Sequence, residues 1–130
     1  EFYPKQKMTL EEYLGFRGRV PGILIALYIK KQKGKAFYKK VKANTLDFPL
    51  VNIAIAVRDG KHYISVGSRP MIASLAHDAM KEADAGAAPE KVAKLAAEGY
   101  SFTDSAQIGK DYRKEITEVY IRRGLKEVSK

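Results

Sequence analysis

The sequence predicts an α+β fold, in which an antiparallel sheet of three to four strands in the first half packs against about three helices in the second half. Two observations lead to this class. Between residues 23 and 66, short apolar runs rich in β-branched and aromatic residues alternate with turn residues. From residue 72 onward, apolar residues recur at helical spacing and glycines interrupt them. Strands that come first and helices that follow favour helices packed on one sheet.

Chain length and composition narrow the class of protein. The 130 residues predict one domain that spans positions 1–130. Cysteine is absent, which excludes disulfides, thiolate catalysis and thiolate-held zinc or iron–sulfur sites, and which fits a reducing, cytoplasmic compartment. No apolar run approaches the roughly 20 residues of a membrane span, so we expect no membrane partner. The chain opens at Glu1 without an initiator Met, which suggests a fragment.

The first predicted element is a short helix. Thr9 and Glu12 have capping-box spacing, and they precede one small apolar face. Pro21 and Gly22 then break any helix, so a change to extended structure is expected after them.

Two hairpins are predicted next. In the first, the apolar run Ile23–Ile29 is joined to a second strand, Ala36–Val41, by a turn at Gly34. In the second, Leu50–Val57 is joined to His62–Val66 by an Asp-Gly turn, which is a strong hairpin signal. Large and small side chains alternate from residue 51 to residue 57, which predicts that both faces of this strand are covered.

Three helical segments follow the strands. Apolar residues between 72 and 80 form the first stripe, which Gly86 ends. Pro89 suits the first turn of the second helix, and Gly99 ends that helix. The third helix is predicted to begin near Gln107 or Lys110, with a stripe made of Tyr112, Ile116, Val119 and Tyr120.

Positive charge is concentrated in the first half of the chain. The net charge is +9, and residues 1–50 hold 11 Lys and Arg against 4 acids, whereas residues 51–130 hold 13 against 11. No acid interrupts the lysines from Lys30 to Lys42. Three interpretations stay open: a nucleic-acid surface with Phe37 and Tyr38 as stacking groups, a solvated hairpin with a lysine-protected edge, or a scaffold domain whose edge pairs with another chain.

The common catalytic patterns are absent from the sequence. His62 and His77 lack a second ligand at helical spacing, so ordinary surface histidines are favoured over a metal site. No serine lies in a nucleophile elbow, and no glycine loop matches a phosphate or dinucleotide motif. The spacing of Asp104 and Asp111 does not argue for an acid–base pair. The residues alone therefore predict a soluble basic domain with no self-contained active site.

Several blocks of residues occur in an order that resembles a known domain. The blocks are Pro21–Leu27, Ala36–Lys39, Asp47–Ala54, Val66–Pro70, Gly109–Arg113 and Arg122–Leu125. In them, and above all from Leu46 to Leu125, the chain resembles the C-terminal domain of the FAD-binding (medium) subunit of molybdenum hydroxylases. This is the family of xanthine dehydrogenase and aerobic carbon monoxide dehydrogenase.

The resemblance implies a function that depends on partners. The subunit of this family carries electrons between an iron–sulfur subunit and an external acceptor through FAD, while a molybdopterin subunit transforms the substrate. FAD is held mainly by an N-terminal domain, so residues 1–130 would be a fragment that lacks it and is catalytically incomplete alone. The implied partners are that FAD-binding domain and the iron–sulfur and molybdopterin subunits. The alternative function is a nucleic-acid-binding module that uses the Lys30–Lys42 hairpin.

Two residues are implied as flavin contacts by their places in these blocks. Leu24 would pack on the isoalloxazine ring, and Lys39 would reach its polar edge, where a cation favours the reduced anion. The structural alternatives are a core strand residue for Leu24 and a further hairpin lysine for Lys39. Tyr112 and Arg113 also have two interpretations, as a FAD-supporting or interface pair or as a buried tyrosine beside a partnered arginine. No catalytic or metal-binding residue is implied.

Overall fold

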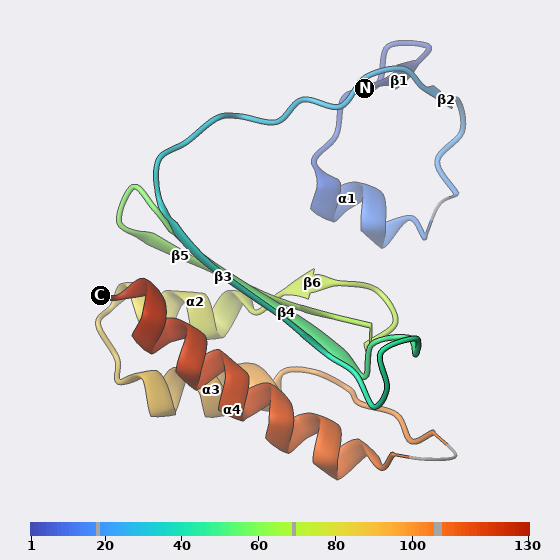
Figure 1. Cartoon of the computed structure of the whole chain (residues 1–130). Helices are drawn as coiled ribbons and strands as arrows, with labels where there is room; N and C mark the ends of the chain where they lie inside the picture. The colour runs from blue at the N-terminus through green and yellow to red at the C-terminus, as the bar shows by residue number, and fades with distance from the viewer. Residues whose placement is uncertain (18, 69, 106–107) are drawn as a thin grey trace. The chain divides into compact units, whose positions relative to one another are not determined.

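The computed structural model describes residues 1–17, 19–68, 70–105 and 108–130. The chain forms two compact units, Glu1–Gln32 and Lys33–Lys130. Figure 1 shows the order of the elements along the chain from blue to red. The chain length predicts a single domain, and the division into two compact units leaves that prediction untested.

The unit Glu1–Gln32 holds one short helix and two short strands. Strand β1 (Phe2–Tyr3) pairs antiparallel with strand β2 (Ile23–Leu24). Helix α1 (Leu10–Gly15) begins with the predicted capping box: Glu12 N–H donates to Thr9 Oγ1 at 3.2 Å, and Thr9 N–H donates to Glu12 Oε2 at 2.7 Å. The two reciprocal bonds satisfy backbone donors that a helix start otherwise leaves free.

The predicted strand Ile23–Ile29 is wrong beyond Leu24, and so is its hairpin with Ala36–Val41. Only Ile23 and Leu24 are in a strand, and their partners are Tyr3 and Phe2. The backbone groups that follow Leu24 are hydrogen-bonded to the first residue of the chain. Ile25 N–H donates to Glu1 C=O at 3.0 Å, and the Glu1 amino group donates to Ala26 C=O at 2.8 Å. The apolar run therefore ends as exposed, irregular chain, with Leu27 76% exposed and Ile29 89% exposed.

The unit Lys33–Lys130 is built on a four-stranded antiparallel sheet. Its strands are β3 (Lys35–Val41), β4 (Val51–Arg58), β5 (Lys61–Gly67) and β6 (Ser74–Leu75), in the order β3-β4-β5-β6. Asp59 and Gly60 join β4 to β5 with φ values of 50° and 73°. Two successive positive φ angles are what a tight hairpin turn requires, so the predicted Asp-Gly hairpin is confirmed.

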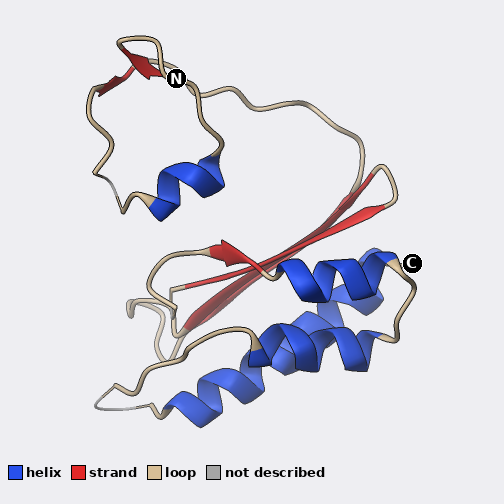
Figure 2. Cartoon of the chain, turned by 180° about the vertical axis from the view of Figure 1, so that it is seen from behind, coloured by secondary structure: helices blue, strands red, loops and turns tan. Residues whose placement is uncertain are grey.

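Three helices cover one face of this sheet (Figure 2). They are α2 (His77–Asp84), α3 (Pro89–Glu98) and α4 (Lys110–Val128). The predicted α+β class, with a sheet of three to four strands packed against about three helices, is confirmed. The core between the layers is made by Val51, Ile53, Ile55, Ile64, Val66, Ala79, Ala83, Val92, Ala93, Ala96, Ile121, Leu125 and Val128.

The alternation along β4 sorts its side chains between the two faces. Ile53 and Ile55 are buried under the helices, as their bulk predicts. Ala54, on the other face, is exposed. The expectation that both faces are covered is therefore wrong for the described part of this unit, because all three of its helices pack on the isoleucine and valine face.

One predicted helix start is revised, and another is confirmed. The apolar stripe from residue 72 was expected to be helical, but Ser74 and Leu75 pair with Val66 and Ser65 in the sheet, and α2 begins only at His77. The last helix begins at Lys110, one of the two expected starts, whereas Gln107 lies outside the described residues. Arg69, in the matching block Val66–Pro70, also lies outside them.

Candidate functional site

Lys39 lies in the middle of β3, directly opposite Ile53 of β4. Strand alternation places its side chain on the same face as Phe37, toward the helices. Phe37 packs against the core, whereas Lys39 is half-buried at its margin. The Lys39 ammonium group lies 5.2 Å from the centroid of the Tyr120 ring in α4. The stem of Lys39 is therefore held along the edge of the core while its charge stays near solvent.

Tyr120 brings a second cation to the same place. The guanidinium carbon of Arg123 lies 5.3 Å from the centroid of the same ring. Among the described residues, no carboxylate forms an ion pair with Lys39 or Arg123. Cations held beside the same ring without a neutralising acid favour an anionic group placed beside them. No sequence pattern predicts Tyr120 as the partner of Lys39, because strand and helix positions become neighbours only in the fold.

Leu24 lies in β2, opposite Phe2, within the unit Glu1–Gln32. It is 48% exposed, so the interpretation of Leu24 as a core strand residue is wrong. A flavin contact of Leu24 stays a prediction. The structure assigns Leu24 and Lys39 to different compact units.

Arg113 is a buried structural link between α4 and the start of β4. Its exposed fraction is 3%, and its Nη1 donates to Leu50 C=O at 2.7 Å while its Nη2 donates to Ser105 Oγ at 2.9 Å. The interpretation of a partnered arginine is confirmed. Tyr112 is 47% exposed, so its interpretation as a buried tyrosine is wrong. The two neighbours point to different surroundings because consecutive helical positions do not share a face.

The two histidines occupy separate places. His62 in β5 is paired with Asp84 at the end of α2: its backbone N–H donates to Asp84 Oδ1 at 2.8 Å, and its ring Nδ1 lies 3.0 Å from the same oxygen. The His62 backbone bond is the main cause that lowers the pKa of Asp84, and the His62 side chain adds to it. No group of three or more possible metal ligands occurs among the described residues.

His77 lines a cavity that the sequence did not reveal. Its volume is about 450 Å³, and it lies where β6 and the start of α2 meet the end of α3. Neither Lys39 nor Leu24 is among its lining residues. Leu75, Ala76, Leu95 and Ala96 give it an apolar floor, while Asp78 and Glu98 lie among the polar groups.

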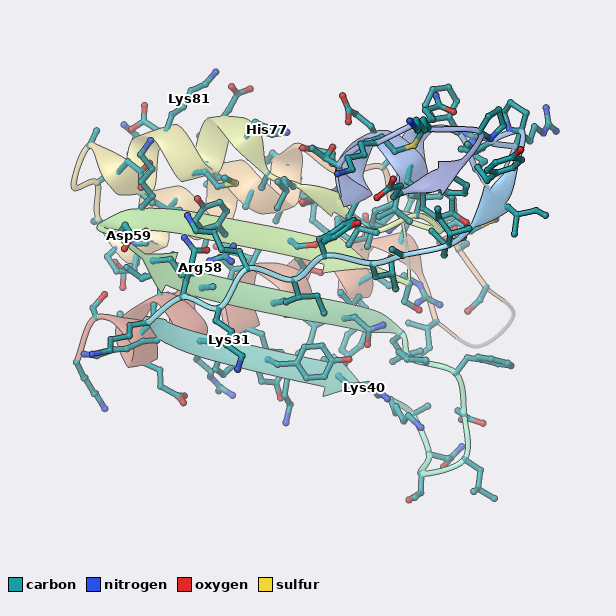
Figure 3. All side chains as sticks on the ribbon, turned by 90° about the horizontal axis from the view of Figure 1, so that it is seen from above. Lys31, Lys40, Arg58, Asp59, His77 and Lys81 are labelled. Atoms are coloured by element: carbon teal, nitrogen blue, oxygen red, sulfur yellow. The ribbon has the colours of Figure 1, made fainter. Side chains whose placement is uncertain are left out.

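The lysine cluster is divided by the fold. Lys35, Lys39 and Lys40 lie on β3, whereas Lys30 and Lys31 belong to the other unit. Figure 3 shows the Lys40 side chain at the end of β3. The hairpin from Lys30 to Lys42 on which the nucleic-acid alternative depended is not formed, because β3 pairs with β4 instead.

No protein-family model matches the sequence, and no curated protein matches it. Solved structures do share its fold. Quinoline 2-oxidoreductase from Pseudomonas putida 86 aligns with a TM-score of 0.60 at 17% identity, over 73% of this chain and 36% of its own. Carbon monoxide dehydrogenase from Hydrogenophaga pseudoflava, in a form that lacks the Mo-pyranopterin moiety of its molybdenum cofactor, aligns with a TM-score of 0.61 at 18% identity, over 73% and 36%.

A third structure, the cyanide-inactivated form of a Cu,Mo-CO dehydrogenase, aligns with a TM-score of 0.61 at 17% identity, over 77% of this chain and 38% of its own. At these identities the likeness is one of fold. This chain spans less than two fifths of the length of the neighbouring chains. Among the described residues, no helix is both long and apolar enough to cross a membrane.

Proposed function

We propose that this chain is the C-terminal domain of the FAD-binding subunit of a cytoplasmic molybdenum hydroxylase. In this role it would cover a flavin that another domain binds, and it would support contacts with the iron–sulfur and molybdopterin subunits. The observation that carries the proposal is the agreement between fold and sequence. The α+β fold is shared with chains of quinoline 2-oxidoreductase and carbon monoxide dehydrogenase. Four of the six sequence blocks that resemble the medium subunit lie on or lead into strands β3 and β4 and helix α4 of the unit Lys33–Lys130.

Residues of these blocks contribute to the packing of α4 and β4. The segment Asp47–Ala54 leads into β4, whose isoleucines form the core. Arg113 holds the start of β4 through Leu50, and Gly124 lets α4 approach Phe37. Agreement at such positions supports a common way of packing α4 on the sheet. It supports the domain assignment more than any single contact with a cofactor.

Lys39 is the residue of this unit that suits a flavin role. Its ammonium and the Arg123 guanidinium flank Tyr120, and both cations would favour a reduced, anionic flavin. Leu24 would supply an apolar surface for the ring, because it is half exposed. No group in this chain would carry out the chemistry. The bound FAD would accept and pass on the electrons.

The proposal is tested on the natural gene product, including any residues that precede Glu1. We expect the purified protein to release FAD on denaturation, at about one equivalent per chain, and residues 1–130 alone to bind FAD weakly or not at all. A gene product without flavin, and without a domain before Glu1, would contradict the proposal.

The role of Lys39 has its own test in that protein. Lys39→Gln is expected to lower the reduction potential of the bound flavin, because a cation that favours the reduced anion is lost. Lys61→Gln is the matched control, because Lys61 is an exposed lysine at the β4–β5 turn. Equal potentials in the two variants would exclude Lys39 from the flavin site while leaving the domain assignment intact.

A further inference from the structure

We propose that the outer edge of β3 binds an acidic, extended segment of another protein, which joins the sheet as a further strand. Within Lys33–Lys130, β3 stands at one end of the strand order and has only β4 as a described neighbour. Strands at sheet edges carry unpaired backbone donors and acceptors, and these are the groups that strand addition uses. The inference does not rest on the flavin-subunit assignment.

The direction of the backbone groups follows from the pairing of the inner strands. Ala76 N–H donates to Ile64 C=O at 2.9 Å, so Ile64 turns its backbone groups toward β6. In an antiparallel sheet these directions alternate along a strand, so Ser65 turns its backbone groups toward β4. Ser65 is opposite Ala54, and Ala54 therefore points to β5 while its neighbour Ile53 points to β3.

The same alternation continues into β3. Ile53 is opposite Lys39, so the backbone groups of Lys39 point inward to β4. The bond from Leu50 N–H to Val41 C=O, at 2.7 Å, agrees with this, because Val41 is two residues from Lys39. Ala36, Tyr38 and Lys40 must then direct their N–H and C=O groups away from the sheet. Three such residues in a seven-residue strand offer a regular backbone ladder.

Charge selects the partner. Lys35, Lys39 and Lys40 lie on β3, and among the described residues no carboxylate forms an ion pair with any of them. Their side chains are distributed over both faces, with Lys40 on the open face and Lys35 and Lys39 on the helix face. Acidic side chains on a paired strand would lie about 4.5–5.5 Å away between Cβ atoms, close enough for favourable pairs.

Two other occupants fit less well. A second copy of β3 would place lysines opposite or diagonal to lysines, and like charges across a strand pair are destabilising. The phosphates of a nucleic acid would be attracted to the lysines. They would also lie against the outward C=O groups of Ala36, Tyr38 and Lys40, which are acceptors like the phosphates. A peptide strand satisfies both the donors and the acceptors of this edge, so we choose an acidic protein segment.

The test uses the whole 130-residue chain and a synthetic, fluorescently labelled peptide of alternating glutamate and threonine. Lys40→Ala removes one charge, whereas Lys40→Pro removes the same charge and also the outward N–H. Proline is tolerated at such edge positions, because the missing N–H has no partner inside the sheet. Fluorescence anisotropy is expected to show about fivefold weaker binding to Lys40→Pro than to Lys40→Ala, the effect of losing one hydrogen bond.

A second experiment changes the peptide and leaves the protein unchanged. It therefore still tests the inference if circular dichroism shows that Lys40→Pro does not fold. When the glutamate peptide is N-methylated at alternate residues, it keeps its charge but loses the backbone N–H donors along one edge. Its binding is expected to be lost. A glutamine-for-glutamate peptide is expected to bind at least about tenfold more weakly, since each lost charge pair removes favourable energy.

Three results would overturn the inference. Equal binding by the parent and N-methylated peptides would mean that charge alone attracts them. Tight binding of a single-stranded oligonucleotide, unaffected by Lys40→Pro relative to Lys40→Ala, would assign the edge to nucleic acid. No binding of the glutamate peptide at low salt would mean that the lysines keep the edge free of partners.

Discussion

Gly124 sits in the middle of α4 because the sheet leaves no space for a larger side chain. A Cβ placed on Gly124 would lie 2.6 Å from Ile55 Cδ1 and 2.9 Å from Phe37 Cε1, and closer still to Phe37 Cδ1. Such distances are far below ordinary carbon–carbon contact. The small residue in the Arg122–Leu125 block is therefore explained by helix–sheet packing.

Gly124→Ala is expected to destabilise the protein by about 1–2 kcal/mol. Overpacking of a filled core costs about 1–3 kcal/mol, and it exceeds the gain of up to about 1 kcal/mol that alanine gives a helix interior. The measurement is the urea midpoint of unfolding. Gly99→Ala is the matched control, because its Cβ would meet Ala96 O at an ordinary 3.5 Å, and its stability is expected to be unchanged or higher. A stabilised Gly124→Ala variant would contradict this account of the packing.

Asp84 is expected to make the free energy of unfolding depend on pH in the acidic range. Bonds from His62 lower its pKa in the folded state below the usual 3.8. A lowered pKa adds stability that is present above the unfolded value and is lost as the pH falls through the lower, folded pKa. The stability difference between the natural chain and Asp84→Asn should therefore be largest above pH 4 and shrink below it. Thermal melts across that pH range measure this difference.

Asp78→Asn provides the comparison for that experiment. Asp78 forms an exposed pair with Lys81 at 3.1 Å, in which both side chains are largely in solvent. Such pairs contribute little to stability. A pH dependence equal in the two variants would remove the special role of the His62–Asp84 contact.

At the scale of elements, α1 depends on its first residues. It has only 6 residues and no buried side chain, so little tertiary packing holds it. The backbone N–H and hydroxyl of Thr9 both bond to Glu12, and they lower the pKa of the Glu12 carboxyl, the backbone bond more strongly. The capping box is therefore the main local support of this helix.

Thr9→Ala is expected to weaken α1 by about 1 kcal/mol, the usual effect of losing an N-cap side chain. Hydrogen exchange of the Tyr13 amide, which donates to Thr9 C=O at 3.0 Å, should become about fivefold faster. Thr45→Ala serves as the control, because Thr45 lies in an exposed loop and accepts a hydrogen bond from Lys42 Nζ through its backbone carbonyl, which the substitution keeps. An unchanged Tyr13 exchange rate would show that the capping box is dispensable.

The elements that the sequence predicted best are those whose signals are local. The Asp-Gly turn, the capping box and the Pro89 helix start depend on a few neighbouring residues, and the structure has them where expected. The strand Ile23–Ile29 failed because a run of β-forming residues does not say which strand will pair with it. The helix expected from Ile72 failed for the same reason, since Ser74 and Leu75 pair with β5.

The candidate site was less predictable than the fold. Lys39 and Leu24 came from a resemblance, and no periodicity marks either of them as functional. The Tyr120 ring beside Lys39 and the cavity beside His77 are formed by segments far apart in the chain. Such contacts depend on how elements pack, which residue spacing within one element cannot determine.

At the scale of the whole molecule, the two compact units differ in what holds them together. Every member of the buried core cluster lies between Val51 and Val128, so the unit Lys33–Lys130 contains a complete core of its own. Residues 33–130 expressed alone are therefore expected to fold. Circular dichroism melts and amide spectra should place Ile53, Ile55 and Ile64 in the same surroundings as in the whole chain. An unfolded fragment would show that the first unit is needed for stability.

The topology of this unit also has a consequence for how quickly it folds. Neighbouring strands follow one another along the chain, and β4 and β5 are joined by two residues, so most sheet pairing is local and should form early. Phe37 and Gly124 meet only after almost the whole unit has been brought together. In chevron measurements, substitutions at Gly60 should then slow folding, whereas substitutions at Gly124 should mainly speed unfolding.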